Sequence, residues 1–593
     1  MNPAVRKIFY FIMFICKVNL SIFAMEDYAV NFSGINDPET LSLLQSISKT
    51  VELKETPPTT NTGLKRRAEA DIPNLLQALH SLAYYNAKVE VEVDFEKQPP
   101  LVTFKINTGP VYPLASFEIV PADRLKQGPF PYSNIDLQDL GIIPGAPAYP
   151  KNILEAEDLL LLKMEKQGYP LVKIVNLEVI ANQATHMIHV TMYVDSGPLC
   201  YFGEVAFKGH KLVSPQLFDK KISWTKGDVY DPMHIERTQN ALESTGLFSS
   251  ISITHGENVS DDGFIPIEIE VLESKHRSIG AGVSYSTDNG FGMFAEWEHR
   301  NIFGRGQKIS FKTLIAQRLQ EGALAYVIPD FCCPKQDLIW IAEFLRQTTK
   351  GYHASSYSFS GIIERQLNDR TRFSYGGMYK ALRDTHSDNN GRFNLIKTPF
   401  QIRWTNTNSI LDPTQGRSLN IKIVPSIQVR KPRFAYCINT ITGTIYFPLR
   451  TDRRLIFAAK ATLGSIFGEK RHTIPPSERF YAGNENLMRG YHYMTVSPLN
   501  RHEPIGGRSM LIGSVEARWR ATETWGWVLF YDFGNVYENY LPELNKKILQ
   551  SVGIGLRYNT PVGPLRLDFA VPLNRRRHID ESFQIYLSIG QAF

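Results

Sequence analysis

The chain has 593 residues, of which 21% are charged, and a formal net charge of +6. That length exceeds what a single hydrophobic core fills, so several domains are expected. The basic excess is small and no basic run is interleaved with aromatic residues, which argues against a nucleic-acid-binding protein.

Residues 1–24 are typical of a secretory signal peptide. Two basic residues precede a mostly apolar run that ends at Ala24, and the chain then becomes acidic. Lys17 and Asn19 interrupt the run, and an N-terminal membrane anchor is the alternative. The rest of the sequence has no apolar run of about eighteen residues, so the exported chain is soluble, peripheral, or inserted as a closed β-barrel.

The chain up to residue 274 mixes helical and strand patterns and repeats itself. VTFKINTGPVYPLASFEI (102–119) parallels VTMYVDSGPLCYFGEVAF (190–207) as a strand, a Gly-Pro turn and another strand. Residues 142–175 and 222–253 also share an order of turn, helix, Gly-containing turn and strand. We therefore predict small α+β modules. They cover residues 25–110, 111–199 and 200–274.

From residue 275 to residue 593, glycine, aromatic residues and strict alternation replace the helical pattern. The connections alternate too, because 521–524 and 559–564 are tight whereas 538–548 and 572–582 are long and charged. Short turns at one end and long polar loops at the other are typical of an outer-membrane β-barrel, with apolar residues outward and polar residues inward. A soluble β-sandwich is the alternative, but it gives no reason for an arginine-bearing face on successive strands.

The longest of these loops, residues 469–507, contains the stretch NLMRGYHY with Arg489. If polar faces line the lumen, Glu516 and Asp532 point into it from neighbouring strands. Folding the loop inward would place the guanidinium of Arg489 between the two carboxylates, which its planar fork suits. The alternative is that Arg489 is solvated and that Glu516 pairs with an arginine of its own strand.

The two residues after the arginine fit an inward-folded loop. Gly490 lets the backbone pass close to the barrel wall, and Tyr491 can pack its ring while its hydroxyl finds a partner. Removing one member of a buried ion pair costs about 3–5 kcal/mol. Because the lumen is expected to hold water, we expect the lower end of that range or less.

The sequence offers no enzyme motif. HExxH, GxSxG and the P-loop are absent, and FGRGQK (303–308) lacks the P-loop spacing and is expected to be a hairpin. The vicinal pair Cys332-Cys333 has no second cysteine pair or nearby histidine to complete a metal site, so a turn is expected there. No cofactor and no metal are predicted. The cysteines that remain after signal removal permit disulfides without assigning them; they are Cys200, Cys332, Cys333 and Cys437.

Several motifs resemble the outer-membrane assembly factor superfamily. NLMRGY (486–491), IGGRSMLIGSVEARW (505–519) and LFYDFGNVY (529–537) resemble its conserved barrel motifs, and the N-terminal modules resemble its polypeptide-transport-associated (POTRA) domains. The resemblance implies that a sixth loop folds inward and locks to the barrel wall. The residues of this loop-to-barrel lock would be Arg489, Gly490, Tyr491, Glu516 and Asp532.

The resemblance also implies a fold. Three POTRA-like β-α-α-β-β domains would precede a 16-stranded antiparallel transmembrane β-barrel, closed by pairing residues 278–286 with residues 583–593. Glycine and serine weaken a strand ladder, so we predict a lateral seam that opens sideways. The seam residues would be Gly280, Gly282, Ser588, Gly590 and Phe593.

Within the superfamily, three modules are similar to the TamA branch. This implies an insertase or transporter in the bacterial outer membrane, with its N-terminal domains in the periplasm, that helps to translocate and assemble outer-membrane proteins such as autotransporters. The implied partners are a TamB-like inner-membrane-anchored protein, the client proteins and outer-membrane lipids, with phospholipid passage as a second role. The alternative is a two-partner secretion pore for a dedicated exoprotein.

Overall fold

The computed structural model describes residues 27–123, 135–286, 288–385, 390–410, 412–450, 452–559 and 565–589. The predicted signal peptide therefore lies outside the described residues. The chain divides into two compact units. One comprises residues 1–206, 223–238 and 253–269, and the other comprises residues 207–222, 239–252 and 270–593. In the described ranges, no helix is long and apolar enough to cross a membrane.

The N-terminal part contains three small three-stranded sheets, with orders β1-β3-β2, β4-β6-β5 and β7-β9-β8. In the first, Leu64 and Leu75 of helix α4 are fully buried against Phe104 of β3. The elements around this sheet are β1 (Ala29–Ser33), α2 (Pro38–Ile47), α3 (Lys49–Glu52), α4 (Asn61–Ser81), β2 (Lys88–Asp94) and β3 (Leu101–Asn107).

The second sheet packs against α5, which begins at a proline and buries residues at helical spacing: Ile153, Ala156, Leu160 and Met164. The elements around this sheet are β4 (Leu114–Pro121), η1 (Leu137–Leu140), α5 (Pro150–Lys166), β5 (Lys173–Asn182) and β6 (Met187–Asp195). The third group comprises β7 (Tyr201–Lys208), α6 (Pro215–Lys221), α7 (Pro232–Glu243), β8 (Phe248–His255) and β9 (Phe264–Glu273).

The order of elements differs from the predicted β-α-α-β-β pattern in two of the three modules. The third follows it, whereas the first has three α-helices between β1 and β2. In the second, a short 3-10 turn takes the place of the first helix, because Gly141 at φ 71° ends it after four residues.

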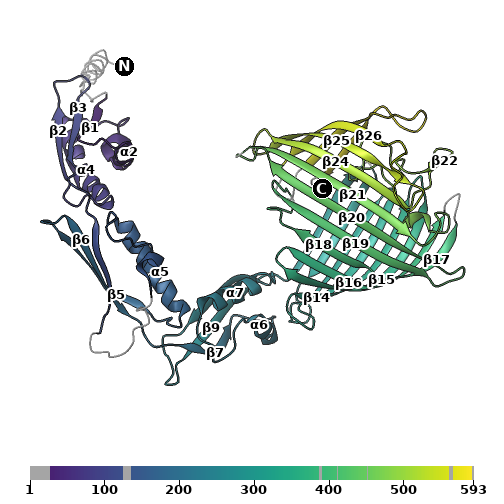
Figure 1. Cartoon of the computed structure of the whole chain (residues 1–593), viewed down its shortest axis with the longest axis horizontal. Helices are drawn as coiled ribbons and strands as arrows, with labels where there is room; N and C mark the ends of the chain where they lie inside the picture. Colours follow the sequence, from purple (N-terminus) through teal and green to yellow (C-terminus); the bar gives the residue numbers. More distant parts are fainter. Residues whose placement is uncertain are drawn as a thin grey trace, which may run out of the picture. The chain divides into compact units, whose positions relative to one another are not determined.

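The C-terminal part is one antiparallel sheet that runs in chain order from β10 to β28 and forms a β-barrel (Figure 1). Segments β17 and β18 each pair with both β16 and β19, so they are the two halves of one strand, interrupted at Pro399, which has no N–H to donate. The segments are β10 (Arg277–Ser286), β11 (Gly290–His299), β12 (Lys308–Ala316), β13 (Leu319–Ile328), β14 (Gln336–Thr348), β15 (His353–Asn368), β16 (Thr371–Thr385), β17 (Gly391–Lys397), β18 (Phe400–Thr405), β19 (Gly416–Gln428), β20 (Phe434–Pro448), β21 (Leu455–Phe467), β24 (Ser509–Arg520), β25 (Trp525–Tyr537), β26 (Leu549–Tyr558), β27 (Leu565–Pro572) and β28 (Gln584–Ile589).

Side chains alternate between the two faces of this sheet. On β25, Trp527 and Leu529 are exposed on the outer face, whereas Phe530 and Asp532 are buried on the inner face. An outer face of apolar and aromatic residues suits contact with lipid chains.

The long loop between β21 and β24 folds into the barrel. It contains η2 (Pro476–Glu478), β22 (Leu499–Asn500) and β23 (Glu503–Pro504). Its residues Met488 and Tyr491 are buried in a cluster with Met510 of β24 and Leu549 of β26. The lumen is therefore packed with side chains at this level.

Candidate functional site: the loop held inside the barrel

The tip of the long loop is a tight turn stabilised by its own residues. The side-chain oxygen of Asn484 accepts hydrogen bonds from the backbone N–H groups of Asn486 and Leu487, at 3.0 and 2.7 Å. Gly490 has φ +90°, and a Cβ there would meet Cβ of Ser551 at 2.8 Å. Glycine is therefore required where the loop backbone passes the barrel wall, as the sequence predicted.

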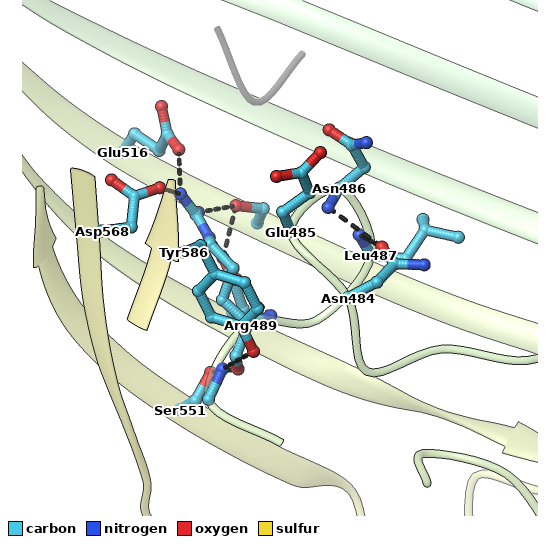
Figure 2. A network of polar contacts seen from close by, with 12 residues as sticks. Asn484, Glu485, Asn486, Leu487, Arg489, Glu516, Ser551, Asp568 and Tyr586 are labelled. Atoms are coloured by element: carbon cyan, nitrogen blue, oxygen red, sulfur yellow. Dashed lines mark hydrogen bonds and ion pairs between the residues drawn. The ribbon is translucent and has the colours of Figure 1, made fainter. Parts of the chain in front are cut away.

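Arg489 follows this turn and is the largest fully buried side chain of the described residues, with 1% of its surface exposed. Its Nε and Nη2 atoms donate to the two oxygens of Asp532, each at 2.8 Å. Its Nη1 atom forms an ion pair with Glu516 at 2.8 Å and donates to Asp568 at 3.2 Å (Figure 2). The structure thus brings Arg489, Glu516 and Asp532 together and adds a third carboxylate.

The backbone and the guanidinium group of Arg489 make further contacts. The Arg489 N–H donates to Asp532 at 3.0 Å, and its carbonyl oxygen accepts from the Ser551 hydroxyl at 2.5 Å. The guanidinium carbon lies 3.5 Å from the centroid of the Phe530 ring. Contact with an aromatic face adds a cation–π interaction that strengthens when water is excluded.

The acceptors of Arg489 are shared with three other buried arginines. Arg518 donates to Glu516 at 2.8 Å, so Glu516 pairs with an arginine of its own strand as well as with Arg489, which is buried and not solvated. Arg557 and Arg566 both donate to Asp568. The network therefore contains four arginines and three carboxylates, and each charge depends on the others because burial makes an unpaired ion costly. The members are Arg489, Arg518, Arg557 and Arg566 with Glu516, Asp532 and Asp568.

Gly490 and Tyr491 connect the loop tip to two strands of the wall. The hydroxyl of Tyr586 on β28 accepts from the Gly490 N–H at 3.0 Å and donates to the Tyr491 carbonyl at 3.1 Å. The Tyr491 hydroxyl donates to the carbonyl of Gln550 on β26 at 2.8 Å. The loop tip is thus bonded directly to β28.

The predicted seam residues are only partly described. Gly280 and Gly282 lie on β10, where a Cβ would meet the side chains of Glu296 and Phe294 on β11 at 2.9 and 2.7 Å. These glycines therefore make room for side chains of the neighbouring strand. Ser588 pairs with β27 through its backbone, and Gly590 and Phe593 lie outside the described residues.

Strands β10 and β28 are in contact, but no backbone ladder joins them in the part of the chain that is described. Closure of the barrel and its count of sixteen strands therefore stay predictions.

Asp568 is the main residue that sequence reasoning missed. The alternation of PLRLDFAVP assigns Asp568 to the inner face together with Arg566, so the signal was present. Register decides which inward carboxylate reaches the loop, and register is not visible in a single strand. Tyr586 and Ser514 were missed for the same reason.

The residues considered for metal or redox chemistry are not part of the charged network. Cys332 is exposed in the turn between β13 and β14, Cys200 is buried, and all four described cysteines are free. Among the described residues, no group of three or more His, Cys, Asp or Glu side chains could hold a metal ion. FGRGQK spans the end of the connection between β11 and β12, and its Lys308 is the first residue of β12.

Comparison with known proteins places this geometry in a family. Residues 301–593 match the protein family described as the Omp85 superfamily domain. Residues 200–274 match the POTRA family, described as a surface antigen variable number repeat. The protein thus combines an Omp85 superfamily domain with a POTRA domain. It is accordingly an outer-membrane protein whose N-terminal POTRA part lies in the periplasm.

Two curated relatives are similar over much of this Omp85 protein. Outer membrane protein assembly factor BamA of Nitratidesulfovibrio vulgaris is 23% identical over 554 residues, which cover 86% of this chain and 66% of that protein. Outer envelope protein 80 of Arabidopsis thaliana, a chloroplastic protein, is 23% identical over 405 residues, which cover 60% of this chain and 52% of that protein. The chain thus spans two thirds or less of the length of these relatives.

A solved structure shows the same fold. BamA from Haemophilus ducreyi lacking POTRA domains 1–3 superposes with a TM-score of 0.71 at 18% identity. The match covers 81% of this chain and all of that one.

Proposed function

We propose that this protein is an insertase and transporter that helps to translocate and assemble outer-membrane proteins such as autotransporters. The observation that carries the proposal is the Arg489 lock, which holds a long loop inside an Omp85 barrel and bonds its tip to β28. The similarity to an outer membrane protein assembly factor supports the same activity. The work is mechanical and needs no catalytic residue.

In this mechanism the seam between β10 and β28 opens sideways. Among the described residues no backbone ladder joins β28 to β10, which suits a seam that opens. Opening would expose the unpaired N–H and C=O groups of both strands, which a client strand can pair with before it enters the bilayer. Release of the Arg489 lock would let β28 move, because Tyr586 ties β28 to the loop tip.

The periplasmic modules would capture clients and a partner. Strand β5 lies at the edge of the second sheet and exposes Val179 and Ile180, which suits strand addition by an extended peptide. A TamB-like inner-membrane-anchored partner follows from the three-module resemblance to TamA, with phospholipid passage as a second role. The same three sheets favour this function over a two-partner secretion pore, for which the resemblance implies two modules.

A disulfide across the seam tests the mechanism. In a variant whose native cysteines are replaced, Gly280→Cys with Ser588→Cys should stop client assembly after oxidation, and reduction should restore it. The matched control is Glu296→Cys with Lys312→Cys, which are paired on β11 and β12 and whose cross-link should leave assembly intact. Undiminished assembly by the cross-linked seam variant would refute the proposal.

A further inference from the structure

The long loop makes a second buried ion pair, away from the Arg489 lock. Glu478, the last residue of η2, accepts a hydrogen bond from Lys380 of β16 at 3.0 Å. Its other carboxylate oxygen accepts from Lys397 of β17 at 2.5 Å. The side chains of Glu478 and Lys397 are 5% and 9% exposed. Both ammonium groups thus converge on one carboxylate in a packed interior, where pairing offsets the cost of desolvation.

The backbone around Glu478 is fixed to the same wall. The Ser477 N–H donates to the carboxylate of Asp384, also on β16, at 2.7 Å. Arg479, which follows Glu478, donates to the carbonyls of Ile474 and Ile505 at 3.0 and 2.7 Å, and these bonds tie the two ends of the loop together. This base segment is therefore held by side-chain charge, by a backbone hydrogen bond and by its own internal contacts.

The two attachment points differ in polarity and in the strands they use. At the base, an acidic loop residue meets lysines of β16 and β17, whereas at the tip Arg489 meets carboxylates of β24, β25 and β27. Strands β19, β20 and β21 separate the two groups in the sheet. Ile474 and Met488 belong to different buried clusters, and Phe480 packs against both of them.

We propose that Glu478, Lys380 and Lys397 form a second anchor, which keeps the base of the loop on β16 and β17 when the Arg489 lock opens. The loop tip then swings about Glu478 and the base stays in the lumen. Glu478 is a positioning residue in this scheme. The inference rests on the proposed function, in which β28 moves and the tip bonded to Tyr586 moves with it.

Hydrogen exchange of the full-length protein in lipid nanodiscs measures base and tip separately. In Arg489→Ala, peptides covering 484–493 should exchange faster while peptides covering 474–481 keep wild-type protection. In Glu478→Gln, the 474–481 peptides should exchange roughly a hundredfold faster, because a buried ion pair loses one partner. The matched control is Glu503→Gln, which removes an exposed acid of the same loop and should change neither peptide.

Two further variants keep the test decisive. Lys397→Met should speed hydrogen exchange of the 474–481 peptides as Glu478→Gln does. Glu478→Lys combined with Lys397→Glu should restore the protection of these peptides from exchange. If the two side chains only filled space, exchanging their charges would not restore it. The second anchor is overturned if base and tip exchange together in Arg489→Ala, or if Glu478→Gln and Lys397→Met both keep wild-type protection. Client assembly is measured in parallel. The seam cross-link experiment tests the proposed function, whereas the hydrogen-exchange pattern tests the second anchor, so a failure of one can be told from a failure of the other.

Discussion

Replacement of Arg489 by alanine should release the loop tip from the barrel wall. The guanidinium pairs with three carboxylates, and it donates to both oxygens of Asp532. Removing one member of a buried ion pair costs about 3–5 kcal/mol, because the remaining charge is left without compensation. Glu516 and Asp568 keep their other arginines, so the loss is concentrated at Asp532, and we expect a destabilisation of about 3 kcal/mol.

The assay is urea unfolding of the purified barrel, followed by the gel shift between folded and heat-denatured forms. Arg489→Lys should fall between wild type and alanine, because it keeps the charge but cannot reach both oxygens of Asp532 as a fork. The control is Arg450→Ala, whose side chain is 68% exposed, and it should cost less than about 0.5 kcal/mol. If Arg489→Ala unfolds at the wild-type urea concentration and keeps its loop protected from exchange, the assignment of the lock is wrong.

Three further predictions follow from the described contacts. Asp568→Asn should also cost about 3 kcal/mol in the urea assay, since the arginines around it lose a shared acceptor, and a wild-type midpoint would remove this residue from the network. Burial and the nearby Glu485 raise the pKa of Asp288, in the turn after β10, from 3.8 to about 7, with Arg318 opposing the shift. Its contribution to stability is therefore complete below the unfolded pKa and is lost as the pH rises to the folded pKa of about 7, so the protein should lose stability relative to Asp288→Asn between about pH 4 and pH 7, and a constant difference would contradict this. Exposed Cys332 should react with a charged maleimide in the folded protein and buried Cys200 only after unfolding; equal rates would contradict the described fold.

Local patterns were enough to predict which barrel side chains face inward. Alternation has a period of two along each strand, so Glu516 and Asp532 were assigned to the lumen from their own segments alone. The contact of Arg489 with both carboxylates could be predicted because the arginine lies in a long loop next to β24. The family resemblance implied that this loop folds into the barrel. These inferences needed only sequence neighbours and one family motif.

Contacts that depend on register and tilt were not predictable in this way. Asp568 comes from a strand 79 positions after Arg489, and its approach depends on the whole intervening sheet. Glu478 lies in a loop without periodicity, and its partners on β16 and β17 are 98 and 81 residues earlier. The burial of Arg489 was not predictable for a related reason, since only the folded loop shows how much of the interior its side chains occupy.

The charged network contributes more to the precise position of the loop than to the free energy that holds it in the barrel. Met488 and Tyr491 already bury apolar surface against the wall, and such contacts are insensitive to small shifts of position. A guanidinium that bonds to both oxygens of Asp532 tolerates little displacement, because hydrogen bonds weaken steeply with distance and angle. Buried ion pairs also contribute little net stability compared with apolar substitutes of similar size. A loop held in this way has one defined position beside β28, yet it can leave that position without the loss of a large hydrophobic core, which is what a repeatedly opening seam requires.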